Sequence, residues 1–145
     1  MYNALSSKVA FDNLESSLSG RLSVYPTLAN AVTLTGHADA WTLSAAYIEV
    51  VPVSTITSDI FLDSILIESV SAADSFQVVI ATGAAGHEVV TAGARFTPVA
   101  NNAMPIIIPI RRKILANTRI AMKVANKAGA SAKTADVSIT YRLVA

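Results

Sequence analysis

The chain has 145 residues and a formal net charge of +1, with 52% hydrophobic residues, 14% charged residues and no Cys. A chain of this length is expected to form one domain that buries enough surface to be stable without a metal or a disulfide. The lack of Cys excludes a disulfide framework and a thiolate zinc site, and it fits synthesis in a reducing cytosol.

The mean hydropathy of +0.50 is high for a soluble protein. The uncharged stretch 96–110 contains three prolines and falls short of the roughly 20 apolar residues that a membrane-spanning helix needs. The N-terminus has no basic segment followed by an apolar run, so it does not resemble a signal peptide. We therefore predict neither a membrane partner nor secretion, and expect the apolar surface to be buried inside the fold and between subunits.

Residues 1–30 differ from the rest of the chain. Apolar residues recur there at near-helical spacing until the sequence Ser-Ser-Leu-Ser-Gly at 16–20 breaks the pattern. We predict an extended N-terminal arm that docks on its own domain or on a neighbour. Its predicted anchors are Tyr2, Leu5, Val9 and Phe11.

Beyond residue 30, short stretches of alternating apolar and polar residues predict β-strands. They cover residues 31–35, 47–53, 61–70, 76–81, 88–92, 106–110, 119–124 and 137–143. About eight short strands with turn residues every ten positions or so are typical of an antiparallel sandwich or barrel. No helical stretch separates them, which disfavours a doubly wound α/β fold. We predict an all-β antiparallel sandwich over residues 31–145.

Two of these strands carry more detailed predictions. Strict alternation over residues 61–70 places Phe61, Ile65 and Ile67 on one face, and Leu62, Leu66 and Glu68 on the other. The three consecutive isoleucines at 106–108 fit a strand that is buried on both faces.

The charges are divided along the chain. Residues 1–94 hold nine acidic and two basic side chains, whereas residues 95–145 hold nine basic side chains and Asp136. The basic residues are spread through apolar sequence without interleaved aromatic side chains, so we predict no nucleic-acid partner. Either the basic C-terminal strands lie beside acidic N-terminal strands within one sandwich, or the two sets lie on different faces and join neighbouring subunits.

The densest charge is the basic cluster Arg111, Arg112 and Lys113, directly after the isoleucine strand. One interpretation is that it binds phosphate or an acidic partner surface. The other is a solvated strand end, because adjacent cations keep a sheet edge from pairing with other chains.

Side chains suited to catalysis are sparse. The two histidines lie beside carboxylates, as His37-Ala38-Asp39 and His87-Glu88. Neither pair has the i, i+4 spacing of helical zinc sites, and the two pairs are fifty positions apart. We therefore predict no metal and no cofactor.

Other catalytic patterns are equally weak. Asp59 and Asp63 would share one face of a strand, but a glycosidase needs opposed carboxyl groups in a cleft lined with aromatic side chains, and the chain has only nine aromatic residues. It contains neither a G-x-S-x-G elbow nor a phosphate-binding loop. We predict that it is not an enzyme, and that the sole Trp41 is a core or interface anchor rather than a ligand platform.

Four stretches together resemble a type of small virion protein of tailed bacteriophages, similar to capsid decoration (cement) proteins. They are residues 76–88, with G-A-A-G-x-E, residues 105–110, residues 114–121, with A-N-T-R-I-A, and residues 135–141, with D-V-S-I-x-Y. The resemblance covers residues 41–145, and residues 1–40 take no part in it.

The resemblance implies a jelly-roll or related β-sandwich without an active site, placed in the virion after synthesis in the host cytoplasm. It also implies a homotrimer that clamps neighbouring subunits of the major capsid protein or another virion protein. We hypothesise that the arm anchors, Trp41 and the basic cluster make these contacts. The main alternative is a tail or fibre module that binds host-surface carbohydrate, with Trp41 and Tyr47 as stacking platforms.

Overall fold

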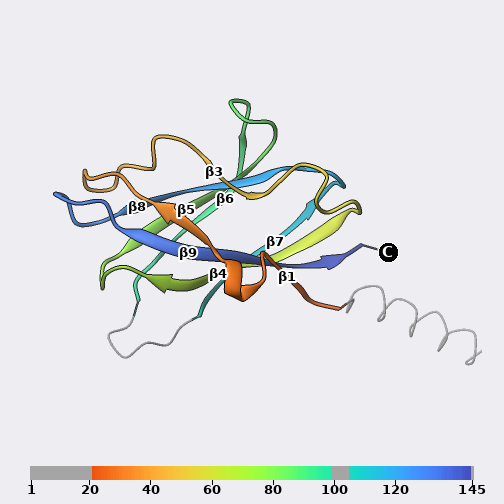
Figure 1. Cartoon of the computed structure of the whole chain (residues 1–145), viewed down its shortest axis with the longest axis horizontal. Helices are drawn as coiled ribbons and strands as arrows, with labels where there is room; N and C mark the ends of the chain where they lie inside the picture. Colours follow the sequence, from red (N-terminus) through yellow and green to blue (C-terminus); the bar gives the residue numbers. More distant parts are fainter. Residues whose placement is uncertain (1–20, 99–104, 145) are drawn as a thin grey trace, which may run out of the picture.

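A computed structural model describes residues 21–98 and 105–144 (Figure 1). Within these ranges the chain forms nine β-strands and one short 3-10 helix. In chain order the elements are β1 (Ser23–Tyr25), η1 (Leu28–Asn30), β2 (Val32–Thr35), β3 (Ile48–Val51), β4 (Ile60–Val70), β5 (Phe76–Thr82), β6 (Val89–Phe96), β7 (Ile106–Ile114), β8 (Ile120–Asn126) and β9 (Thr134–Leu143). The eight predicted strands correspond to β2–β9, and no helix in the described ranges is long and apolar enough to cross a membrane.

The strands pair in a nested order. Strand β5 pairs with β6, β4 with β7, β3 with β8, and β2 with β9, all antiparallel. The first half of the chain is therefore folded back along the second half, like one long hairpin whose tip is the β5–β6 turn. Further antiparallel pairs, β4 with β9 and β5 with β8, roll this hairpin into two sheets.

The two sheets have the strand arrangement of a jelly roll. Sheet A has the order β1-β9-β4-β7, with β2 also paired to β9, and sheet B has the order β3-β8-β5-β6. Apart from the β5–β6 hairpin and the step from β1 to β2, each connection crosses from one sheet to the other. This confirms the predicted all-β, jelly-roll-like sandwich.

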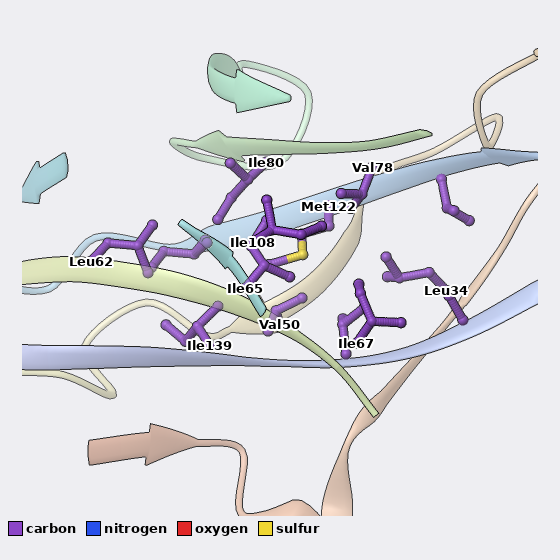
Figure 2. Packing of buried hydrophobic residues seen from close by; sticks show 14 of the residues in the cluster. Leu34, Val50, Leu62, Ile65, Ile67, Val78, Ile80, Ile108, Met122 and Ile139 are labelled. Carbon is purple, nitrogen blue, oxygen red and sulfur yellow. The ribbon is translucent and has the colours of Figure 1, made fainter. Parts of the chain in front are cut away.

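The core lies between the sheets and is almost wholly aliphatic (Figure 2). Ile65, Ile67 and Ile139 point inward from sheet A and meet Ile80 and Met122 from sheet B, and all five are completely buried. The only stacked aromatic pair among the described residues is Phe76 with Phe96, with ring centroids 5.3 Å apart. Close packing of this kind explains how so few aromatic residues suffice.

The predicted faces of β4 are wrong at its first residues. Leu62 is completely buried, whereas Phe61 is 38% exposed on the outward side. The register with β9 shifts between Leu62 and Ser64, so that Asp63 is an extra residue in β4. A β-bulge of this kind interrupts the alternation of side chains. The inward positions Leu62 and Ile65 are therefore three residues apart rather than two.

The prediction that the isoleucine strand is buried on both faces is also wrong. Strand β7 pairs only with β4 and forms an edge of sheet A. Ile108 faces the core, but Ile107 is 62% exposed on the outer side. An apolar run in sequence does not distinguish a central strand from an edge strand whose outer face is apolar.

Part of the predicted arm belongs to the sandwich. Ser23–Tyr25 forms β1, in which Ser23 is opposite Tyr141 and Tyr25 is opposite Ile139. Strand β2 continues along the same edge of β9 from Val137 onward. Residues 26–31 are therefore looped out opposite Ser138.

Candidate interaction surfaces

Sequence-predicted interface residues fall in three places. Tyr2, Leu5, Val9 and Phe11 lie outside the described residues. Trp41 lies in the loop between β2 and β3, and the basic cluster lies at the end of β7. The structure therefore separates Trp41 from the basic cluster, because Trp41 contacts Arg95 of sheet B whereas the cluster lies on the edge strand of sheet A.

The basic cluster lies at an irregularity in the edge strand β7. Opposite Leu62 and Ser64 of β4, strand β7 contains one residue more than regular pairing needs, and Arg111 there has a φ of +55°. All three basic side chains of the cluster are exposed. Lys113 lies 3.3 Å from Asp59, and among the described residues no carboxylate forms an ion pair with Arg111 or Arg112.

Asp59 holds the chain at the end of the edge strand β7. Its carboxylate accepts a hydrogen bond from the backbone amide of Ala116, at 2.9 Å. That hydrogen bond and the nearby Lys113 ammonium lower the pKa of Asp59. The carboxylate therefore stays ionised and fixes the chain just after β7.

The outward side of sheet A, here called the A face, combines hydroxyl groups at its centre with exposed apolar side chains around them. The hydroxyls of Ser64 and Thr140 lie 2.5 Å apart on adjacent strands, and both residues are buried although they point away from the core. The exposed apolar side chains of the A face are Leu22, Val24, Phe61 and Ile107.

Two polar atoms on the A face are buried without a hydrogen-bond partner among the described residues. Ser138 lies between the inward-facing Val137 and Ile139, so its side chain points outward, yet it is fully buried and its Oγ is unpaired. Oε1 of Glu68, at the second bulge of β4, is also buried and unpaired. Such orphaned groups are uncommon in folded proteins because each costs free energy.

Next to these atoms, a carboxylate is fully used. Asp136 of β9 accepts hydrogen bonds from Thr33 at 2.6 Å and from Ser69 at 2.5 Å. It links β2, β9 and β4 across the A face. Asp136 is therefore satisfied, whereas Ser138, two residues further along the same strand, is not.

The outward side of sheet B, here called the B face, is held by an ion cluster around Arg119. This guanidinium contacts Glu49 at 2.7 Å and Glu88 at 2.9 Å, and it donates to the carbonyl of Gly83. Burial opposes the charge of Arg119, but hydrogen bonds to the two carboxylates outweigh it and raise its pKa. The cluster ties β3, β8 and the β5–β6 turn together.

Glu88 takes part in a second set of contacts. Its Oε2 accepts a hydrogen bond from the amide of Gly86 at 3.0 Å. The pKa of Glu88 is lowered, first by a hydrogen bond from its own backbone amide and then by Arg119 and Gly86, which together exceed the effect of burial. His87, its neighbour in sequence, is not part of this cluster.

The loop of residues 36–47 lies over the other end of the B face. The amide of Trp41 bonds to the carbonyl of Asn126 at 2.8 Å, and the guanidinium of Arg95 lies 4.4 Å from the Trp41 ring centroid. The ammonium of Lys123 lies 4.6 Å from the Tyr47 ring centroid. These cation–π contacts occupy one face of each ring that a sugar could otherwise stack upon.

Asn126 and Gly36 position this loop. Asn126 is fully buried, and its amide donates to the carbonyl of Ala128 at 2.6 Å. A Cβ atom at residue 36 would lie 2.5 Å from Oδ1 of Asn126, so the close approach requires glycine.

The candidate catalytic and metal-binding residues do not converge. Among the described residues no group of three or more His, Asp, Glu or Cys side chains could hold a metal ion. His37 pairs with Asp39 at 3.3 Å on an exposed loop, while Asp59 is used by Lys113 and Ala116. A hollow of about 380 Å³ beside the turn 83–85 reaches Arg119, whose charge is already met by two carboxylates.

Sequence reasoning missed Arg119, Arg95 and the hydroxyls of the A face. The Arg119 cluster joins residues that are 31 and 70 positions apart, so no local pattern identifies it. The division of charge along the chain was the available signal. Each of the pairs Arg119–Glu49, Arg119–Glu88 and Lys113–Asp59 joins a basic residue after position 94 to an acidic residue before it, which favours pairing within one sandwich.

Comparisons with known proteins give only distant structural likeness. No protein-family model matches the chain, and no curated protein matches it. A structure of infectious bursal disease virus Gt strain is similar over 88% of this chain and 34% of that chain, with 14% identity and a TM-score of 0.47. The VP2 subviral particle of the same virus is similar over 86% of this chain and 33% of that chain, with 12% identity and a TM-score of 0.42. This chain thus spans about a third of their length.

Proposed function

We propose that the chain is a non-enzymatic structural protein of a virus particle, which decorates and stabilises a phage capsid by binding neighbouring capsid subunits. The observation that carries this proposal is the A face of a jelly roll, where apolar side chains are exposed and the basic cluster lies at the sheet edge. Jelly rolls serve in viral capsids, lectins and cupins alike, so the fold alone does not decide between functions.

The exposed chemistry favours a protein partner. A sheet surface with exposed Leu, Val, Phe and Ile side chains suits packing against another protein. The basic cluster lies at the edge of the same sheet, and two of its three cations are not paired with carboxylates among the described residues. Such cations at the rim of an interface steer an acidic partner and fix its orientation.

Capsid binding can be tested with assembled shells from the virus that encodes the chain. The purified chain is mixed with shells that lack it, and co-sedimentation is measured. We expect binding that weakens with salt, and at least a tenfold loss of affinity when Arg111, Arg112 and Lys113 are all replaced by Ala. Lys127→Ala, which removes an exposed cation from the β8–β9 loop, is the matched control.

Deleting residues 1–20 tests the arm in the same assay. We expect attachment to be lost while the circular dichroism of the β-domain is retained. Full attachment of the truncated chain would show that the arm is not needed. No binding of the intact chain to shells would refute the decoration role.

The carbohydrate-binding alternative has its own test. A glycan screen would reveal micromolar binding that Trp41→Ala abolishes if the chain were a tail or fibre module. Arg95 and Lys123 already cover one face of Trp41 and of Tyr47, and a screen that finds no such binding would refute this alternative.

A further inference from the structure

We infer that strand β6 of one copy pairs edge to edge with β6 of a second copy about a two-fold axis, so that the two B sheets join into one continuous sheet. The surface is the open edge of sheet B, and its occupant is another copy of this chain. This self-association goes beyond the proposed capsid role and is independent of it.

Each sheet has two edges, and among the described strands three of the four edges are obstructed. The β1/β2 edge of sheet A consists of strands of three and four residues, separated by residues 26–31. The β7 edge contains Pro109, the irregularity at Arg111 and the basic cluster. The β3 edge of sheet B is four residues long and irregular between Glu49 and Val51. Short strands, prolines, bulges and cations all hinder pairing with another strand.

Strand β6 forms the fourth edge and is eight residues long, without proline. It pairs with β5, and among the residues that the structure describes no backbone hydrogen bond joins it to any other segment. Its one irregularity is Thr91, an extra residue opposite the step from Ile80 to Ala81, and residues 92–96 pair regularly with β5. Along such an edge, alternate residues turn their amide and carbonyl groups away from the sheet, where another strand can bind them.

The single charged side chain of β6 does not block this edge. Arg95 is opposite Gln77 of β5, and Gln77 is followed by the core-facing Val78, so Arg95 points to the B face. Its guanidinium lies 4.4 Å from the ring centroid of Trp41. The charge is therefore held above the sheet rather than in the plane where an incoming strand would lie.

A second copy carries the strand that this edge requires. An edge strand pairs with another extended strand whose outer backbone groups are free, and β6 meets this condition in every copy. Antiparallel pairing about a two-fold axis uses one β6 edge from each copy, so association ends at a dimer rather than a fibre. The two four-stranded B sheets then form one sheet of eight strands. A net charge of only +1 gives little repulsion between copies.

Pairing along the whole strand is centred on Gly93 when Thr91 remains an extra residue in both copies. Val90 of one copy is then opposite Arg95 of the other. Both side chains lie on the B face, because Val90 is opposite Ala81, which follows a core-facing residue of β5. Val90 is 58% exposed in the single chain, and in the dimer it packs against the aliphatic part of the Arg95 side chain.

The native mass of the purified full chain tests this pairing. We expect a dimer of twice 15.2 kDa at high micromolar concentration, which dissociates on dilution. Val90→Lys places an ammonium group opposite Arg95 of the other copy and should raise the dissociation constant at least tenfold, whereas Val90→Glu places a carboxylate there and should keep the dimer. Val53→Lys is the matched control and should leave the dimer unchanged, because Val53 is 63% exposed in the loop between β3 and β4.

Hydrogen exchange of the wild-type chain gives a second readout that uses no variant. The outward-facing amides of β6 should exchange at least tenfold more slowly at high than at low micromolar concentration, because pairing gives them acceptors. The amides of β7, the obstructed edge of sheet A, are the control and should exchange at the same rate at both concentrations.

Several results would overturn the inference. A chain that stays monomeric at high micromolar concentration, or that forms the trimer implied by the resemblance to cement proteins, has no two-fold β6 pair. A dimer that responds equally to Val90→Lys and Val90→Glu, or whose β6 amides exchange equally fast at both concentrations, is joined elsewhere. Neither experiment uses capsid shells, so a dimer that fails to bind shells would refute the decoration role alone, and a monomer that binds them would refute the β6 pair alone.

Discussion

The two outward faces of the sandwich satisfy their polar groups in different ways. On the B face, Arg119 meets two carboxylates, and the β2–β3 loop lies over the sheet with cations against both of its aromatic rings. On the A face, apolar side chains are exposed, and Ser138 and Glu68 have buried atoms without partners. Both sheets expose apolar side chains, Val89 and Val90 among them on β6, so the two faces differ in how their polar groups are paired.

The difference arises from where the chain places its long loop. The loop 36–47 crosses from sheet A to sheet B and reaches Arg95, which lies on the edge strand β6. The connection between β1 and β2 is only six residues long and stays at the edge of β9. It lies opposite Ser138, but it is too short to cross the sheet.

The largest effects are expected in the core that both faces share. Ile139→Ala in sheet A and Met122→Ala in sheet B should each lower the free energy of unfolding by about 2–5 kcal/mol, because both side chains are fully buried. Chemical denaturation followed by both tryptophan fluorescence and circular dichroism should give coincident transitions for each variant. Transitions that separate would show that the two sheets unfold independently. Each sheet would then have its own free energy of unfolding, and the two faces would have to be compared on that basis.

A smaller effect is expected on the B face. Arg119→Met removes a guanidinium whose side chain is 11% exposed and leaves the carboxylate of Glu88 without its ion pair. We expect a loss of roughly 1–3 kcal/mol in urea unfolding. On the A face, Asp136→Asn keeps one acceptor for Thr33 and Ser69, and the loss should be below about 1 kcal/mol. An equal loss of unfolding free energy at both sites would contradict the idea that polar contacts stabilise the B face more than the A face.

The smallest effect is a dependence on acid. The pKa values of Glu88 and Asp59 are lowered in the folded chain from their ordinary values of 4.5 and 3.8. The unfolded chain therefore binds more protons, and stability falls as the pH drops through 4.5 and 3.8 toward the folded pKa values. Above about pH 5.5 this contribution is complete.

Two variants separate the contributions to that dependence. Glu88→Gln should flatten the fall that begins near pH 4.5, and Asp59→Asn the fall that begins near pH 3.8. Thermal unfolding measured from pH 3 to pH 7 checks both. A slope unchanged in both variants would assign the acid sensitivity to other carboxylates.

Much of the strand pattern was predictable because it depends on local alternation. Eight of the nine described strands overlap the predicted stretches, and the predicted sandwich is confirmed. The short β1 was missed because three residues give too little alternation to recognise. The faces of β4 were wrong at Phe61 and Leu62 because a bulge is a property of two paired strands.

The candidate surfaces were only partly predictable. Trp41 and the basic cluster stand out by residue type, and the structure finds all four residues exposed. Their use as contacts stays a prediction, as does that of the four arm anchors, which lie outside the described residues. The partner of Trp41 was not predictable, because Arg95 lies 54 positions further along the chain.

The sequence by itself determined the all-β class, the position of most strands and the scarcity of catalytic side chains, because these follow from local patterns and residue types. Tertiary structure decided which apolar strand is an edge, how the acidic and basic halves of the chain pair, and on which outward face the Arg119 cluster lies. Those features depend on strand register and on contacts between residues far apart in the sequence. Both arise only when the strands pair.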